Sequence, residues 1–428
     1  KNRDMSKLLR TLWSNRFTLL SSVLIAVMAA VCWQSLSNAP YSQLQPEYAV
    51  LDGDPEYKDI IGFDPDRFDW QPYDYPALPP IPQGTKTVYL TWKIPETTPL
   101  FVNHILFTTT NQDAYVYLGN ELIYMHGNWD NLTDTYGRTL HFLHNNESLA
   151  GKQLTIMLHT GYANWLGSID YFFIDSERSL IRKVSLTDAI YIASLSIALS
   201  LIVFLVMDLV WRGIDRQRTM QLYLIAFLVS FILWTTGTSS FFSRMLGMPA
   251  LWWEIHLIML YIMPIICARI TQDIVAPRFL SMVRTAKNIF IVLLAAATVM
   301  EIMQLNGYMN LLRLLYPVFL IGSLVLIYPL VRSSWTHHPA CRYATFAMTA
   351  IVLFGGIDTL HWEYHQLSAM LSTTVFSIYA SIPFIFHTIR EQMLKDAALA
   401  QENEELVREL AISQNEAQRD FLTGCYNR

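Results

Sequence analysis

Long apolar runs alternate with polar stretches and divide the chain into regions of different texture. One apolar run covers about residues 17–36, and seven more follow at 188–211, 220–239, 251–270, 288–305, 311–331, 343–360 and 369–387. About 20 apolar residues in a helix cross the hydrocarbon core of a bilayer. The pattern therefore predicts an N-terminal transmembrane helix (17–36) and a seven-helix transmembrane bundle (187–388).

The segment between these apolar regions has the texture of a β domain. An acidic, Pro-rich arm (37–85) comes first, and short alternating runs such as TVYLTWKI (87–94) and AYVYLGNELIYMHG (114–127) fill residues 86–183. Alternation with a period of two, interrupted by tight turns, is typical of antiparallel strands. The fold class predicted is a mixed, multi-domain membrane protein that contains an antiparallel β-sandwich. The composition agrees, because 53% of the residues are hydrophobic and only 15% are charged.

Basic residues predict how the chain is oriented. Cytoplasmic loops of membrane proteins carry an excess of Lys and Arg. The N-terminal segment (1–16) is rich in both, and the outer loops contribute Arg244. The loops assigned to the cytoplasm contain Arg212, Arg216, Arg218, Arg269, Arg278, Arg284, Lys287, Arg332 and Arg342. This places both termini in the cytoplasm and residues 37–183 outside. The net charge of −5 gives no reason to expect nucleic-acid binding.

This order of regions resembles a bacterial family of seven-transmembrane receptors with diverse intracellular signalling modules. In that family a jelly-roll sensor domain, related to galactose-binding domains, precedes seven helices. The strand–turn–strand stretch at 114–127 matches its hairpin. The resemblance implies a bacterial inner-membrane receptor for an extracytoplasmic ligand such as a carbohydrate. Trp129, Tyr136, Tyr162 and Trp165 are candidates for a stacking face on the sandwich, and the alternative is that they are core or rim aromatics.

Ionisable residues near the outer ends of the predicted spans form a second candidate site. They are Glu254, His256, Glu301, Asp358, His361, Glu363 and His365. Ionisable groups inside a membrane are costly and are often functional, and histidines with carboxylates suit a divalent metal. The hypothesis is an outward-facing polar pocket for a ligand, a metal or protons. The alternative is that these residues face water or the underside of the sandwich.

The polar segment 389–419 predicts a helix that continues from the last span. It lacks Gly and Pro, and a heptad register places Leu399, Asn403, Leu406, Leu410 and Ala417 at a and d positions. Such a seam predicts a parallel homodimer. The alternative is a single solvated helix.

The last residues predict what the connector leads to. Asp420, Leu422, Thr423, Gly424, Asn427 and Arg428 match the opening motif of GGDEF-type diguanylate cyclase domains, while Cys425 replaces the usual Leu. The resemblance implies that the complete protein condenses two GTP molecules into cyclic di-GMP with Mg²⁺ or Mn²⁺. The 428 residues hold no catalytic residue of this kind and no cofactor of their own, because the sequence stops before the metal carboxylates and the guanine-binding residues. We expect that the chain was cut here or that the remainder was not resolved.

Two other functions are compatible with the same pattern. A receptor histidine kinase would need a phospho-accepting His after the connector, and residues 388–428 contain none. An ion-coupled transporter is compatible with the outer carboxylates and histidines, and it predicts internal symmetry among the spans. The predicted partners are membrane lipid, a second copy of the chain and an unidentified ligand.

Overall fold

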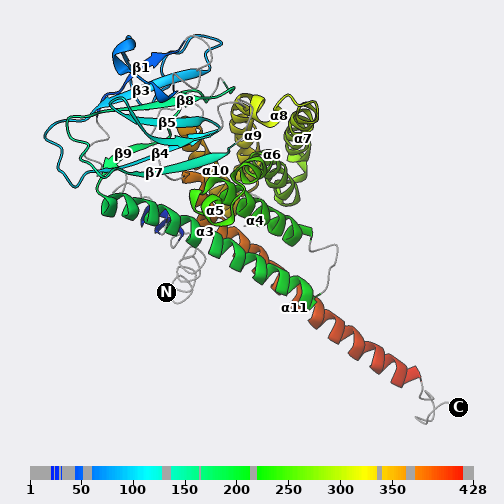
Figure 1. Ribbon diagram of the computed structural model, residues 1–428. Coiled ribbons are helices and arrows are strands. Elements are labelled where there is room, and N and C mark those ends of the chain that lie inside the picture. Colours follow the sequence, from blue (N-terminus) through cyan, green and yellow to red (C-terminus); the bar gives the residue numbers. More distant parts are fainter. Residues whose placement is uncertain are drawn as a thin grey trace, which may run out of the picture.

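The described chain consists of a β domain and a set of long helices (Figure 1). The computed structural model describes residues 21–23, 25–27, 30, 44–51, 60–127, 136–162, 165–212, 219–334, 340–362 and 372–417. Figure 1 shows the β domain at one end of the helices, and helix α11 (Ser377–Ala417) extending away from them towards the C-terminus.

Two antiparallel sheets form the β domain. The larger sheet has the strand order β2-β1-β3-β8-β5-β6, and the smaller has the order β7-β4-β9. The strands are β1 (Glu47–Val50), β2 (Gln71–Pro72), β3 (Thr87–Lys93), β4 (His104–Thr110), β5 (Asp113–Leu118), β6 (Glu121–His126), β7 (Arg138–His144), β8 (Gln153–His159) and β9 (Phe172–Asp175).

Alternate residues of the strands fill a core that the two sheets share. Val88, Leu90 and Trp92 of β3 point to this core, as do residues of β4, β8 and β9. The Trp92 ring stacks on Phe172 of the smaller sheet with centroids 4.1 Å apart. The predicted antiparallel β domain is confirmed, whereas its jelly-roll topology stays a prediction.

The described part of the acidic arm packs on the larger sheet. Strands β1 and β2 lie within the predicted arm yet pair in that sheet. Phe63 is buried on the outer face of the sheet, 5.3 Å from Tyr89 and 4.4 Å from Tyr117 between ring centroids. Part of the predicted acidic arm (37–85) therefore belongs to the β domain. The acidic residues of this segment favour exposure to solvent, but the aromatic residues between them bury apolar area on the sheet.

The helical region follows the predicted apolar runs closely. Its helices are α3 (Glu177–Arg212), α4 (Thr219–Thr238), α5 (Ser240–Leu246), α6 (Pro249–Ile274), α7 (Leu280–Ile302), α8 (Gly307–Asn310), α9 (Leu312–Ser334), α10 (Ala340–Trp362) and α11. Within the described residues, six helices are long and apolar enough to cross a membrane, namely α3, α4, α6, α7 with its preceding turn, α9 and α10.

The seventh predicted span, 369–387, corresponds to the start of α11. Residues 369–371 lie outside the described residues, and a 3-10 turn, η4 (Thr373–Phe376), precedes the helix. Ile378, Tyr379 and Phe384 are buried in the core of the bundle. A polar segment begins at Arg390, so the apolar part of α11 is only about 20 Å long, against about 30 Å of hydrocarbon. The count of seven spans stays a prediction.

The predicted segments at the two ends are only partly described. Residues 21–23, 25–27 and 30 are helical, and Ile25 packs against the bundle core. The rest of the predicted first span and residues 1–16 lie outside the described residues. The predicted connector is one continuous helix with α11 as far as Ala417. The cyclase-like opening motif at 420–428 lies outside the described part of the chain.

The β domain rests directly on the helices. Leu106, Tyr171 and Phe173 on the outer face of the smaller sheet pack against Leu180 and Val184 in the first turns of α3. The smaller sheet therefore has one face on the sandwich core and part of the other on α3, while Phe142 on that second face is exposed. The edge strand β7 lies against Thr238 at the end of α4 and against the start of α6.

Candidate ligand cavity under the β domain

A cavity lies inside the helical bundle, directly beneath the β domain. Its walls come from α4, α6, α9 and α10 and from the start of α11, and Arg138 of β7 and Trp165 cover its outer end. It offers about 110 Å³ to the centres of water-sized molecules, whereas one buried water needs roughly 10–15 Å³ on the same measure. The cavity is therefore large enough for an organic ligand.

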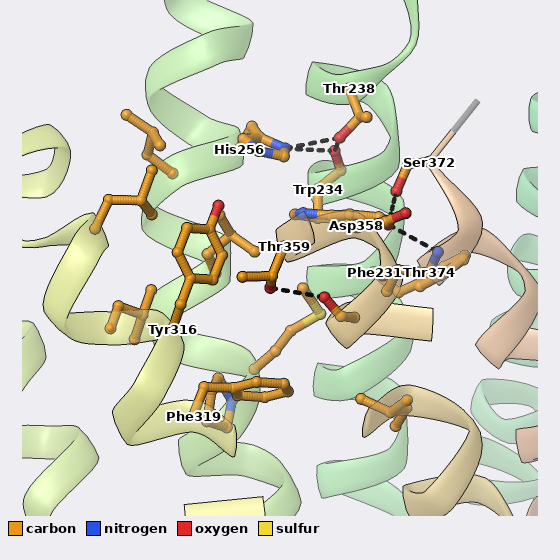
Figure 2. A pocket seen from close by; sticks show the side chains of 18 of the residues that line it. Phe231, Trp234, Thr238, His256, Tyr316, Phe319, Asp358, Thr359, Ser372 and Thr374 are labelled. Atoms are coloured by element: carbon orange, nitrogen blue, oxygen red, sulfur yellow. Dashed lines mark hydrogen bonds between the residues drawn. The ribbon is translucent and has the colours of Figure 1, made fainter. Parts of the chain in front are cut away.

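Most of the cavity wall is apolar. Phe231 and Trp234 of α4 face Tyr316 and Phe319 of α9, and Met263 and Cys267 of α6 lie deeper in the bundle. Figure 2 shows polar groups at one end of the cavity and the rings of Tyr316 and Phe319 towards the other. A cavity lined by aromatic rings with a few convergent polar groups is the usual form of a small-molecule site.

His256 lies between two tryptophan rings at the polar end. Its ring stacks on Trp253 and Trp234, with centroids 5.4 and 5.7 Å away. Thr238 Oγ1 donates to the Trp234 carbonyl oxygen at 2.9 Å and so accepts from His256 Nδ1 at 2.8 Å. This arrangement assigns the proton to Nδ1 and leaves Nε2 as a hydrogen-bond acceptor.

Asp358 of α10 caps the start of α11. Its carboxylate accepts from the backbone N–H groups of Thr373 (2.7 Å) and Thr374 (2.9 Å) and from the hydroxyls of Thr373 (2.8 Å) and Ser372. Ser372 occupies the N-cap position of η4 but makes no side-chain cap bond of its own. The first orphan donors of this helical segment are thus satisfied by a neighbouring helix.

Arg138 places a positive charge at the outer end of the cavity. Its Nε is 3.3 Å from the carboxylate of Asp170, and its NH1 donates to the Thr238 carbonyl oxygen at 2.9 Å. Both charged side chains are almost fully buried, at 3% and 2% exposure. Tyr191 of α3 lies within electrostatic range of Arg138. The Tyr191 hydroxyl accepts from the backbone N–H of Ser372 at 3.0 Å. A polar network therefore connects the β domain to the start of α11.

The predicted outer set of ionisable residues is divided by the structure. His256 and Asp358 line the cavity, and His361 is buried farther along α10. The Glu301 carboxylate instead accepts from the backbone N–H of Tyr308 at 3.3 Å. Glu254 lies within electrostatic range of Glu301. Glu363 and His365 lie outside the described residues. No group of three or more His, Cys, Asp or Glu side chains among the described residues is placed to hold a metal ion.

The predicted aromatic residues of the sandwich lie mainly at its junction with the helices. Trp165 lines the cavity and meets Trp253 edge-on, with centroids 6.0 Å apart. Tyr162 packs in the same cluster, and Tyr136 contacts the ring of His126 at 5.5 Å. Trp129 lies outside the described residues. Whether any of these residues binds a carbohydrate stays a prediction.

Arg138 is the main residue that sequence reasoning missed. It belongs to β7, where the strand pattern concerns alternation and gives no information about the helices below. The preceding Gly137 has a positive φ of 68° and approaches α6 closely. A glycine followed by an arginine next to a predicted strand was the one available signal, and it is weak without the fold.

Compared with protein-family models, with curated proteins and with solved structures, the chain matches none. The geometry of the cavity and the residues around it are therefore the basis for assigning a function.

Proposed function

We propose that the protein is a bacterial inner-membrane receptor in which a small molecule in the cavity acts on α11. In this proposal α11 controls a C-terminal diguanylate cyclase domain whose opening motif is residues 420–428. The observation that carries the proposal is that the turn leading into α11 is part of the cavity wall. Ser372 and Thr374 of this turn, Ser377 at the start of α11, and Asp358 of α10, which bonds to the turn, all line the cavity.

The geometry supports a direct mechanical route from the cavity to the connector. A ligand that contacts Ser372 or Asp358 alters the cap at the first turn of the segment leading into α11. From Ser377 the helix runs without interruption to Ala417. A ligand shifts such a helix only if it binds two arrangements with unequal affinity. The cap is a suitable place for the two arrangements to differ, since it joins α10 to the turn before α11 through a few hydrogen bonds.

The connector supports a dimeric mechanism. Leu399, Leu406 and Leu410, which the heptad register places on one seam, are about half exposed in the single chain. A second copy of the chain would cover them. In this proposal the dimer brings two cyclase domains face to face, each with GTP and Mg²⁺ or Mn²⁺, and the seven-span topology with a cytoplasmic C-terminus places them inside the cell.

Changing the phase of the connector tests the proposal without knowledge of the ligand. In the protein that includes the sequence after residue 428, inserting four residues after Arg408 rotates one end of the seam against the other, whereas inserting seven restores its phase. We expect the four-residue insertion to change basal cyclic di-GMP synthesis at least about fivefold and the seven-residue insertion to restore it. Equal synthesis of cyclic di-GMP by the unaltered protein and both insertion variants, or no synthesis by any of them, would contradict the proposal.

A further inference from the structure

We infer that the cavity binds a single-chain amphiphile with an anionic head, of the class of medium-chain fatty acids. In this assignment the carboxylate lies beside Arg138 at the outer end, and the acyl chain extends between α4, α6, α9 and α10. The inference deepens the proposed function and depends on it only for the consequence of binding.

The length of the apolar space favours one extended chain. Eleven residues of α6 separate His256 from Cys267, and both line the cavity, which corresponds to about 16 Å along the helix. A second, smaller cavity shares Phe227, Cys267 and Ile351 with the first and continues towards Phe384 of α11. The two cavities are therefore neighbours inside the bundle, with these three side chains in the wall of both.

The wall chemistry excludes a strongly hydrophilic ligand from these cavities. Below the polar end, most of the wall is apolar, with Phe227, Leu260, Met263, Phe319 and Ile351 among its residues. The hydroxyls of Thr271, Thr359 and Ser381 also reach the wall, but each already donates to a carbonyl of its own helix. Most hydroxyls of a sugar placed there would lose their water without a replacement. A hydrocarbon chain, by contrast, gains free energy with every methylene that it buries.

The polar end selects an acceptor group, and Arg138, which is paired with Asp170, is its cation. Arg138 and Asp358 are the charged residues of the wall among the described residues. The carboxylate of Asp358 already accepts four hydrogen bonds, which is about its full capacity. A guanidinium offers donors only, and it binds carboxylates with favourable geometry. Thr238 and His256 lie beside it and can complete the shell around a carboxylate.

Two neighbouring glycines provide a matched pair of variants. Gly355 lines the cavity, and a Cβ there would lie 3.5 Å from the Phe319 ring, in ordinary contact. Gly356 would place its Cβ in open space, with nothing within 4 Å. Gly355→Leu therefore fills the cavity, whereas Gly356→Leu adds the same atoms to the same helix outside it.

The test measures binding of radiolabelled dodecanoate to the 428-residue chain in phosphatidylcholine nanodiscs, with empty nanodiscs subtracted. Hexanoate, octanoate, decanoate, dodecanol and dodecylamine compete for the site. We expect affinity to rise about fourfold per methylene (about 0.8 kcal/mol), and dodecanoate to exceed dodecanol and dodecylamine at least tenfold. We also expect Gly355→Leu to weaken binding at least tenfold and Gly356→Leu to leave it within about twofold.

Three outcomes would overturn the assignment. They are equal binding of dodecanol and dodecanoate, equal binding by the Gly355→Leu and Gly356→Leu variants, and a tightly held phospholipid that dodecanoate does not displace. Arg138→Lys and Arg138→Gln add a further arm, in which Lys should retain more of the preference for carboxylate than Gln. The ligand comparison on the unaltered chain keeps the test decisive if Arg138→Gln fails to fold.

The binding result and the signalling result are independent. If dodecanoate binds as expected but cyclic di-GMP synthesis by the longer protein does not respond to it, the ligand class stands and the receptor role fails. If the connector insertions change synthesis while dodecanoate does not bind, the receptor role stands and the ligand class fails.

Discussion

Single residues hold the β domain against the helices, and Gly137 is the clearest of them. A Cβ at this position would lie 2.5 Å from the carbonyl oxygen of Pro249, the first residue of α6. The backbone φ of 68° also disfavours any side chain. Gly119, at the β5–β6 turn, has a similar φ of 63° but has nothing within 4 Å.

These two glycines separate backbone strain from steric conflict. Gly119→Ala should cost about 1–2 kcal/mol in the free energy of unfolding, because only the left-handed conformation is strained. Gly137→Ala should lower the unfolding temperature clearly more, because the added methyl group also forces β7 away from α6. Thermal unfolding of both variants in the same detergent measures the difference. Equal losses would mean that the close approach at Gly137 relaxes without cost.

A second prediction at this scale concerns the buried histidine of the β domain. His141 bonds through Nε2 to Thr109 Oγ1 (2.8 Å) and through Nδ1 to the Tyr124 hydroxyl (3.1 Å). Burial, with a smaller contribution from His126, lowers the pKa of His141 well below its usual range. In the unfolded chain the pKa returns to about 6.5.

The unfolded state therefore takes up a proton that the folded state does not, and this happens as the pH falls below about 6.5. The free energy of unfolding should fall there by up to about 1.4 kcal/mol per pH unit for this histidine. His141→Gln removes the titrating group and should flatten the loss between about pH 7 and pH 5. Near-ultraviolet circular dichroism during thermal unfolding provides the readout, and an unchanged slope in His141→Gln would contradict the assignment.

At the scale of elements, the junction between α10 and α11 is the critical feature. The four hydrogen bonds of Asp358 replace the cap that Ser372 does not supply. Asp358→Asn keeps the shape but exchanges one acceptor oxygen for a donor NH₂ group. It should leave at least one donor at the start of η4 without an acceptor, which costs about 1–3 kcal/mol.

Hydrogen exchange measures this loss where it occurs. Amides at 372–380 should exchange about tenfold faster or more in Asp358→Asn, since 1.4 kcal/mol corresponds to a factor of ten. Asp273→Asn is a suitable control, because Asp273 makes a part-exposed ion pair with Arg269 at 2.9 Å, far along α6. If amides 372–380 exchanged at the same rate in Asp358→Asn as in Asp273→Asn, contacts other than Asp358 would hold the start of α11.

At the scale of the whole molecule, the proposed dimer depends on the second half of α11. Leu406 and Leu410 are 53% and 60% exposed, and Ile412 is 60% exposed on another side of the helix. The heptad register places the two leucines on the dimer seam and Ile412 outside it.

Glutamate substitutions distinguish the seam from general exposure. The double variant Leu406→Glu/Leu410→Glu should shift the purified chain from dimer to monomer, because two buried like charges would face each other across the seam. Ile412→Glu should leave the dimer intact. Light scattering after size exclusion measures the mass. Dissociation by Ile412→Glu alone would require a different seam.

The apolar runs and the strand alternation by themselves determined the elements of this protein. They located six membrane-length helices and an antiparallel β domain ahead of them, because periodicity reports local burial directly. The starts were less well located, since α3 begins 11 residues and α7 eight residues before the predicted runs. His256 and Asp358 could be selected from the sequence as well, since an ionisable group in an apolar run stands out.

Only the tertiary structure decided which of the selected residues share a site. It separated Glu254 and Glu301 from His256, and it brought Arg138 of a strand and Trp165 of a loop over a cavity in the helices. It also packed the described part of the acidic arm on the larger sheet and assigned Asp358 to the cap of α11. Periodicity carries no information about contacts between distant segments, because these depend on how whole faces pack together once both elements have formed.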